Sequence, residues 1–369
     1  MIQKNLAIIG ASYLQLPLIE KAKDMGYITH VFAWAANDVG EKAADFFYPI
    51  SIIEKDSILN KCREIGICGI CSIGSDLAML TVNYVANKLD LVGNSLHSTE
   101  ISTNKHQMRL AFENHGDPSP KSFLVNEDTD FESLQISYPA IVKPTDRSGS
   151  RGVSKVNSWH DVKEAVGAAI KEGFEKQALL EEFVEGKEYS VEYISYRGHH
   201  HFLALTEKFT TGAPHFIETG HMEPANVKDD ILVKIKFIVE HALDSLEIKN
   251  GASHSEIKID ESGTIKIIEI GGRMGGDCIG SDLVKYSTGV DFVKCVIDVA
   301  CCREPDLTPC CEKRAVQSRF IFTEDDLYEL ELLKKEKPEK LIRIAFLDKE
   351  AIGHITDSSN RAGCYVVEV

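Results

Sequence analysis

The chain has 369 residues, of which 43% are hydrophobic and 27% are charged, and its formal net charge is −16. This length predicts two or three domains around a sizeable core. The acidic balance disfavours a general nucleic-acid or anionic-membrane surface, because like charges repel. No apolar run approaches the ~18 to 20 residues of a membrane span, and the start, MIQKNLAIIG, lacks the pattern of a signal peptide.

Ten cysteines are scattered through segments that we expect to be strands and helices. A chain of this size does not need disulfides for stability, so we expect free thiols and a cytoplasmic location. Cys68 and Cys71, and the doublets Cys301–Cys302 and Cys310–Cys311, leave a zinc or redox site open. No second pair with zinc-finger spacing accompanies them, which disfavours that interpretation.

Residues 1–98 alternate short apolar strands with helical patterns, which predicts a Rossmann-like, mostly parallel sheet. The first turn, Gly10-Ala11-Ser12-Tyr13, lacks the GxGxxG glycines of a dinucleotide site, so a dehydrogenase is disfavoured. Further along, the sequence predicts helices at 102–115, 159–172 and about 290–302. The run His199–His201 is expected in a solvated hairpin turn after Arg197-Gly198.

The first candidate binding element is an apolar strand that leads through Lys143 into a loop rich in Gly, Ser and Arg, YPAIVKPTDRSGSRGV. Gly149 and Gly152 allow backbone N–H groups to approach a polyphosphate closely, and the lysine supplies a point charge. Considered alone, the loop fits an ordinary surface hairpin about as well.

The second element is LLEEFVEGKEYSVE at 179–192, an apolar strand that enters a hinge and continues as an alternating strand. Such a hinge can present main-chain donors and acceptors to an adenine edge while a nearby carboxylate holds ribose hydroxyls. A charged hairpin is the alternative for this stretch.

The third element is the pair Glu256 and Glu269, thirteen residues apart on two apolar strands joined by a turn at 261–263. On neighbouring antiparallel strands these carboxylates would be buried like charges. A divalent cation resolves that conflict. Mg²⁺ takes one or two protein carboxylates and shares its other positions with waters and nucleotide phosphates.

The fourth element is GGRMGGD, directly after Glu269. Its glycines allow tight backbone packing, and Arg273 can fork onto a carboxylate or phosphate. A purely structural glycine turn is the alternative.

These four elements, in this order, resemble the ATP-grasp superfamily, and especially its carboxylate–amine ligases such as the bacterial L-amino-acid (dipeptide) ligases. The resemblance covers essentially the whole chain and implies a mixed α/β and α+β multidomain fold that clamps ATP between two antiparallel sheets. The implied domains are a Rossmann-like pre-ATP-grasp domain (1–98), an ATP-grasp small or lid subdomain (99–187), an ATP-grasp large subdomain (188–302) and a small C-terminal α+β segment (303–369).

The resemblance also implies which residues bind ATP. Within this set, the loop 148–153 resembles the family's cover over the triphosphate, Glu181 with the Phe183-Val184 backbone resembles the adenine hinge, and Glu188 resembles the ribose-binding acid. The implied ATP-binding residues are Lys105, Lys143, Ser148, Gly149, Ser150, Gly152, Val153, Glu181, Phe183, Val184 and Glu188.

For the chemical step, the resemblance implies that Glu256 and Glu269 hold Mg²⁺, with Mn²⁺ as an alternative. Arg273 matches the arginine that steadies an acyl phosphate. In FIETGHMEPA, Glu218 is implied near the amine substrate and His221 near the acyl phosphate. Considered alone, His221 would more often be a structural histidine.

Two positions depart from the family pattern. Gly271 stands where many ATP-grasp enzymes have an Asn, which leaves the number of metal ions open. Asp277 stands where some relatives have an aromatic residue in the substrate pocket, so the resemblance does not identify the substrates.

The expected function is therefore an ATP- and Mg²⁺-dependent ligase that activates a carboxylate as an acyl phosphate, joins it to an amine and releases ADP and phosphate. Amino-acid or dipeptide ligation is one form of this reaction. A carbamoyl-phosphate-synthase-like or carboxylase-like enzyme, and a non-catalytic nucleotide-binding regulatory protein, stay open as alternatives. The expected partners are small-molecule carboxylates and amines, and a homodimer is compatible with the resemblance.

Overall fold

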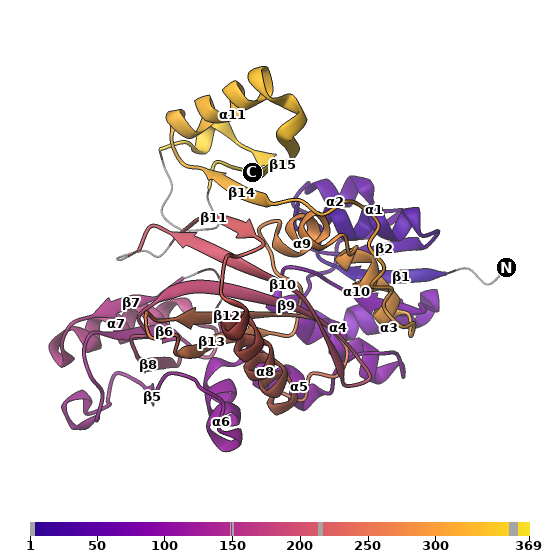
Figure 1. Ribbon diagram of the computed structural model, residues 1–369. Coiled ribbons are helices and arrows are strands. Elements are labelled where there is room, and N and C mark those ends of the chain that lie inside the picture. The colour runs from indigo at the N-terminus through magenta and orange to yellow at the C-terminus, as the bar shows by residue number, and fades with distance from the viewer. Residues whose placement is uncertain (1–3, 148, 150, 213–216, 354–360) are drawn as a thin grey trace.

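The computed structural model describes residues 4–147, 149, 151–212, 217–353 and 361–369. Within these ranges the strands form three sheets, which we call the N-terminal, small and large sheets (Figure 1). The predicted loop residues Ser148 and Ser150 lie outside the described residues. None of the helices in the described ranges is long and apolar enough to cross a bilayer.

The N-terminal sheet is parallel, with the strand order β3-β2-β1-β4. All of β1 is buried, as expected for a central parallel strand that is covered on both faces. The predicted alternation of strands and helices is confirmed. Its elements are β1 (Asn5–Ile9), α1 (Leu16–Asp24), β2 (Ile28–Phe32), α2 (Val39–Ala43), β3 (Phe46–Tyr48), α3 (Lys55–Ile65), β4 (Gly69–Cys71) and α4 (Asp76–Lys88).

The helix predicted at 102–115 is two helices, α5 (Leu96–Thr103) and α6 (Lys105–His115). Asn104 separates them because its backbone is extended and its side chain accepts hydrogen bonds from the backbone N–H groups of His106 and Gln107. An asparagine in this position caps the N-terminus of the following helix. Lys105 is therefore the first residue of α6.

The small sheet is antiparallel, with the order β5-β8-β6-β7. The helix predicted at 159–172 is present with those bounds, and its apolar face, including Val162, Val166 and Ala169, packs on the sheet. A capping box of Ser158 and Asp161 begins it. The elements are β5 (Ser122–Val125), β6 (Ala140–Pro144), β7 (Ser154–Val156), α7 (Trp159–Glu172) and β8 (Ala178–Glu182).

The large sheet is antiparallel and has eight strands in the described chain, in the order β13-β12-β9-β10-β11-β14-β16-β15. Its last three strands come from the C-terminal segment, which therefore extends this sheet. The elements are β9 (Lys187–Tyr196), β10 (His199–Thr210), β11 (Glu218–Glu223), α8 (Asp229–Ser245), β12 (Gly251–Ile259), β13 (Ile265–Gly271), α9 (Val284–Thr288), α10 (Phe292–Ala300), β14 (Val316–Ile321), α11 (Glu324–Glu336), β15 (Leu341–Leu347) and β16 (Gly363–Glu368).

The prediction that His199–His201 lies in a solvated turn is wrong. Arg197 and Gly198, both with positive φ, make the turn by themselves, and the three histidines begin β10. The ring of His200 is fixed there by the Ser195 hydroxyl at 2.7 Å. Because a two-residue turn is enough to join β9 and β10, the histidines that follow it belong to β10.

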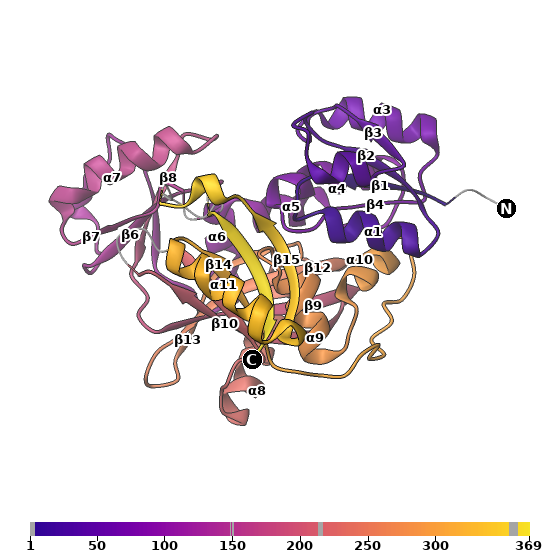
Figure 2. The ribbon, with the colours of Figure 1, turned by 90° about the horizontal axis from the view of Figure 1, so that it is seen from above.

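One hydrophobic core joins the N-terminal sheet to the large sheet. The helix α10 supplies Phe292, Ile297 and other buried side chains to a cluster that also contains residues of β1, β9 and β12. The N-terminal sheet and the small sheet lie on opposite sides of the molecule with the large sheet between them, as both views show (Figure 2). All ten cysteines are free thiols.

Candidate active site

A cavity of about 180 Å³ lies between the small sheet and the large sheet, and we call it the inter-sheet cavity. Most of the described residues that were predicted to bind ATP line it. Gly152 does not, because its Cα faces Ala169 and Glu172 of α7. The predicted residues in the lining are Lys105, Lys143, Gly149, Val153, Glu181, Phe183, Val184 and Glu188.

Glu181 lies at the centre of a buried ion network on the floor of this cavity. Its carboxylate accepts from Lys143 at 2.7 Å and from Arg109 at 2.9 and 3.3 Å. Burial alone would raise the pKa of Glu181, but the two cations outweigh it and lower the pKa to about 2. Arg109 also donates to the Ile268 carbonyl at 2.6 Å, so the network connects β8 of the small sheet to β13 of the large sheet.

The hinge between β8 and β9 places Phe183 and Val184 at the cavity wall. The ammonium of Lys155 lies 3.9 Å from the ring centroid of Phe183, and Lys258 donates to the Val184 carbonyl at 3.3 Å. An aromatic face and a main-chain segment therefore meet at one end of the cavity, as a planar base would require.

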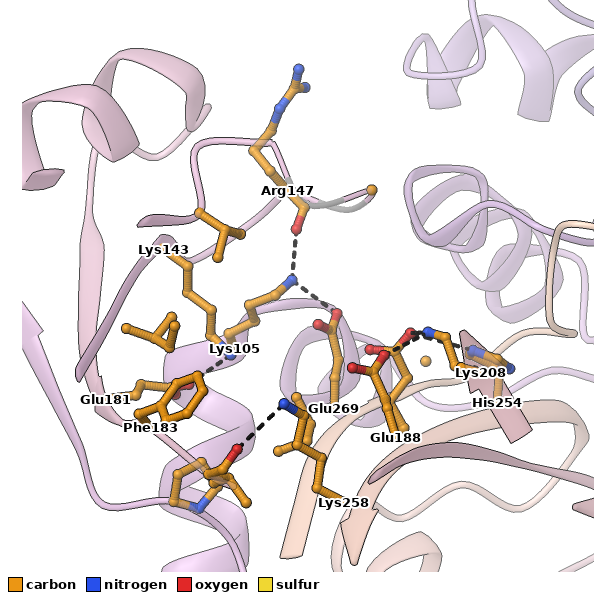
Figure 3. A pocket seen from close by; sticks show the side chains of 18 of the residues that line it. Lys105, Lys143, Arg147, Glu181, Phe183, Glu188, Lys208, His254, Lys258 and Glu269 are labelled. Atoms are coloured by element: carbon orange, nitrogen blue, oxygen red, sulfur yellow. Dashed lines mark hydrogen bonds and ion pairs between the residues drawn. The ribbon is translucent and has the colours of Figure 1, made fainter. Parts of the chain in front are cut away.

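Lys105 connects the loop after β6 to the large sheet (Figure 3). Its ammonium donates to the Arg147 carbonyl at 2.7 Å and pairs with Glu269 at 2.8 Å. The lysine is nearly buried, and these two oxygens hold its charge in place.

Glu256 and Glu269 face each other across β12 and β13 as directly paired residues. Each carboxylate has a lysine partner: Glu269 pairs with Lys105, and Glu256 pairs with Lys208 at 2.5 Å. Lys208 on β10 also lies 3.1 Å from a carboxylate oxygen of Glu188. Burial opposes the charge of Lys208, but the surrounding carboxylates dominate and hold its pKa well above the usual range.

A second cavity of about 590 Å³ lies between the large sheet, the β1–α1 loop and the C-terminal segment, and we call it the C-terminal cavity. It adjoins the inter-sheet cavity, because six residues line both. These shared residues are Gly149, Lys208, Glu218, His254, Glu256 and Arg273.

Arg273 is held at this junction by Asp76 at the start of α4, through hydrogen bonds of 2.9 and 3.1 Å. Gly271 makes room for that pair. A Cβ on Gly271 would lie 2.6 Å from Asp76 Oδ1, so a larger residue there would displace the carboxylate. The glycine at position 271, where the family pattern has Asn, thus leaves space for the ion pair between Arg273 and Asp76.

The predicted residues Glu218 and His221 lie on β11 and line the C-terminal cavity. His221 stands opposite Lys208 in the β10–β11 ladder and is only 1% exposed. Burial lowers its pKa, so the imidazole is neutral near pH 7. Its Nε2 is 3.9 Å from Asp277, which is too long for a hydrogen bond.

The ATP-grasp domain profile matches residues 136–282, which contain β6, β7 and β8 of the small sheet, β9 to β13 and Arg273. Residues 136–282 of this chain therefore form an ATP-grasp domain. The predicted fold class is confirmed as well, since solved ATP-grasp structures superpose on nearly the whole chain.

Among solved structures, the L-amino acid ligase from Bacillus licheniformis matches with a TM-score of 0.83 and 24% identity, covering 99% of this chain and 93% of that one. The alanine–anticapsin ligase of Bacillus subtilis is 26% identical over 306 residues, 73% of this chain and 64% of that protein. The D-alanine–D-alanine ligase of Flavobacterium johnsoniae is 27% identical, over 69% of this chain and 85% of the relative. This chain thus spans about 64% of the alanine–anticapsin ligases that it matches.

Sequence reasoning missed several charged residues in and around the two cavities. Asp76 and Arg109 come from helices with no motif, and Lys208 follows Glu207 in an ordinary alternating strand. His254, two residues before Glu256, forms a buried ion pair with Glu192 and lies in the wall shared by both cavities. One signal was available: Glu192 and His254 are both polar residues inside apolar strands, which is the pattern of a buried pair.

Proposed function

We propose that this chain is an ATP- and Mg²⁺-dependent carboxylate–amine ligase that forms a carbon–nitrogen bond and releases ADP and phosphate. The observation that carries the proposal is the junction of the two cavities. There, Glu256 meets Lys208 and Arg273, and its strand neighbour Glu269 pairs with Lys105 in the inter-sheet cavity. The two cavities on either side suit a nucleotide and a second small molecule.

The inter-sheet cavity suits ATP, with the base near Phe183 and the phosphates near the lysines. Lys105 and Lys143 are already fixed by carboxylates and a loop carbonyl, so their charges need little reorganisation when phosphates arrive. Gly149, with φ of 71°, keeps the loop backbone close to the phosphate end.

The donor set fits a hard divalent cation that is shared with phosphates. Glu256 and Glu269 are directly paired across two strands, and in the described chain no third His, Cys, Asp or Glu completes a protein-only metal site. Two carboxylates plus waters and phosphate oxygens are what Mg²⁺ takes. Bound there, such an ion would neutralise phosphate charge beside Lys105 and Lys208.

The chain's own residues then support two transfers. A substrate carboxylate oxygen attacks the γ-phosphorus of ATP and the bond to the ADP oxygen breaks, while Arg273 and Lys208 offset the anionic charge. The amine nitrogen next attacks the acyl carbon, the bond to the phosphate oxygen breaks, and the amine loses a proton. Glu218 and His221 line the C-terminal cavity, and the carboxylate of Glu218 can accept that proton.

The test is phosphate release from Mg·ATP across a matrix of carboxylic acids and amines, with mass spectrometry of the products. We expect phosphate only with particular acid and amine pairs, together with a condensed product whose mass equals the two substrates minus water. Phosphate with bicarbonate instead of an organic acid would favour the carboxylase-like alternative. ATP binding without turnover across the matrix would favour the regulatory alternative.

A further inference from the structure

Two cysteines lie where β4 meets the end of α10, and neither of them lines the inter-sheet or the C-terminal cavity. Cys68 comes directly before β4, and Cys301 comes directly after α10. The backbones of the two elements touch here, since a Cβ on Gly69 would lie 2.6 Å from the Ala300 carbonyl oxygen and 3.1 Å from Cys301 Sγ. Both cysteines adjoin this contact, and their thiols are hydrogen-bonded to each other.

This pair of thiols can be reached from solvent. Cys68 is exposed and Cys301 is half-buried. Cys278 and Cys364 are also close, with their Sγ atoms 3.9 Å apart, but both of them are buried. Because a reagent must reach the sulfur before a thiol can react, the pair of Cys68 and Cys301 is the one suited to react in the folded chain.

The surroundings of Cys68 favour its thiolate form. The hydrogen bond from Cys301, together with the charges of Arg303 and Lys4, lowers the pKa of Cys68 to about 7, although burial acts in the opposite direction. Arg303 is fixed near the pair by Asp298, to which it donates at 3.0 and 2.5 Å. An exposed thiolate beside cations is the nucleophile that thiol–disulfide exchange requires.

Cys301 has the opposite character. Its contact with Cys68 and its burial raise its pKa, so it keeps its proton while Cys68 is a thiolate. Once the Cys68 sulfur is part of a disulfide it carries no negative charge, and the largest cause of the raised pKa of Cys301 is gone. Cys301 can then act as the second thiol, with the hydroxyl of Tyr27 hydrogen-bonded to its sulfur.

We propose that Cys68 and Cys301 form a redox-active dithiol, a modification site that is oxidised by small disulfides. The Cys68 thiolate attacks one sulfur of a disulfide RSSR, the bond between its two sulfurs breaks, and the RS⁻ that leaves takes a proton from water. The Cys301 sulfur then attacks the Cys68 sulfur, and its proton passes to the second RS⁻ that leaves. The two protein thiols are oxidised to one disulfide, and RSSR is reduced to two RSH.

The experiment treats the reduced full chain with oxidised glutathione near neutral pH, alkylates the remaining thiols after denaturation and maps the peptides by mass spectrometry. Cys68→Ala and Cys301→Ala remove the two thiols in turn. Cys302→Ala is the matched control, because Cys302 is exposed and directly follows Cys301. This control is also needed for the assignment, since Cys301 and Cys302 fall in one tryptic peptide.

We expect a bridge between the peptides of Cys68 and Cys301 in the wild type and in Cys302→Ala, formed at rates within about two-fold of each other. Cys301→Ala should stop at a glutathione adduct on Cys68, and Cys68→Ala should form neither product. A wild-type bridge that is lost in Cys302→Ala, a wild-type adduct that never resolves, or no reaction at Cys68 overturns the proposal.

A second measurement tests the contact between the two thiols, using the pH dependence of the alkylation of Cys68 by iodoacetamide in the folded chain. In the wild type the midpoint should lie near the lowered pKa of about 7, and in Cys301→Ala it should move up toward the ordinary value of 9.0. Circular dichroism checks that the variant is folded. A wild-type midpoint at the ordinary value, or the same midpoint in both proteins, also overturns the proposal.

Discussion

Gly271 is a single position whose missing side chain sets the geometry of the junction between the two cavities. Its Cα lies so close to Asp76 that the ion pair between Asp76 and Arg273 exists only because no Cβ is present. The guanidinium is thereby fixed from the N-terminal part of the chain, far away in sequence. Glu256, Glu269 and Arg273 come from β12, β13 and the segment directly after β13, whereas Asp76 comes from the start of α4.

We expect Gly271→Ala to open the pair between Asp76 and Arg273, because the new Cβ would lie 2.6 Å from the aspartate oxygen. Overpacking of this kind typically costs about 1 to 3 kcal/mol, and turnover should fall with it. Gly272→Ala is the matched control, since its Cβ would meet nothing closer than 3.5 Å. Urea unfolding and ATP-dependent phosphate release measure the two effects, and equal results for both variants would contradict the argument.

Glu269→Gln should reduce ATP turnover by at least about 100-fold while the fold is kept, because it removes the charge of one of the two proposed metal ligands. Mn²⁺ affinity in the presence of ADP, followed by electron paramagnetic resonance, should fall in parallel. Glu261→Gln, in the exposed turn between β12 and β13, is the control. A Glu269→Gln enzyme with normal turnover would remove the metal assignment.

At the residue scale, the sequence predicted those contacts that a short motif places close together along the chain. Glu256 and Glu269 were predicted as neighbours on antiparallel strands, and the structure pairs them directly. Lys208 and Asp76 could not be predicted, since their roles depend on strand register and on the packing of one domain on another. Their places in the site follow from tertiary structure alone.

At the scale of elements, the connection between β8 and β9 links the small sheet to the large sheet through Gly186. This glycine has a φ of 117°, and a Cβ there would lie 2.3 Å from the Ile259 carbonyl oxygen at the end of β12. The backbone of the hinge therefore rests directly on the large sheet, and only glycine allows that contact.

We expect Gly186→Ala to destabilise the chain by more than Gly198→Ala, because both residues have positive φ but only Gly186 faces another backbone. The Gly198 change should cost about 1 kcal/mol from backbone strain alone, and the Gly186 change should cost at least about twice that. Chemical denaturation of the two variants gives the difference directly. Equal losses would mean that the contact with Ile259 relaxes without cost.

Helices and strands could be predicted where the local sequence pattern is strong. The pairing of distant strands into sheets could not. The helix at 159–172 has an amphipathic pattern and a capping box, and its predicted bounds were correct. The break between α5 and α6 arises because the side chain of Asn104 caps the N-terminus of α6. The addition of β14, β15 and β16 to the large sheet arises from hydrogen bonds between strands that are far apart in the sequence. Neither leaves a periodic signal.

For the whole molecule, two buried groups on the large sheet make stability depend on pH in the same direction. Burial raises the pKa of Glu223 from 4.5 to about 8, although hydroxyls of Thr206 and Ser287 donate to it. Burial alone would lower the pKa of His254, but Glu192 outweighs it and raises the pKa from 6.5 to about 8. In both cases the folded chain keeps a proton that the unfolded chain releases.

The free energy of unfolding should therefore fall as pH rises through these windows, from 4.5 to 8 for Glu223 and from 6.5 to 8 for His254. Glu223→Gln keeps a neutral, hydrogen-bonding side chain, so it should flatten the profile and be more stable than the wild type above pH 8. Thermal unfolding across this range measures both curves. A Glu223→Gln profile parallel to that of the wild type would show that the carboxyl does not titrate in the fold.

The strand order of the large sheet places two groups of charged residues at different positions across one continuous sheet. The carboxylate pair lies on β12 and β13 at one edge, whereas Asp277 and Arg361 meet beside β11, β14 and β16 toward the other. The two groups of charged residues are therefore separated by several strands of the same sheet. If the proposed ligase function holds, a change in the C-terminal segment would leave the carboxylate pair on β12 and β13 in place, because three strands lie between them.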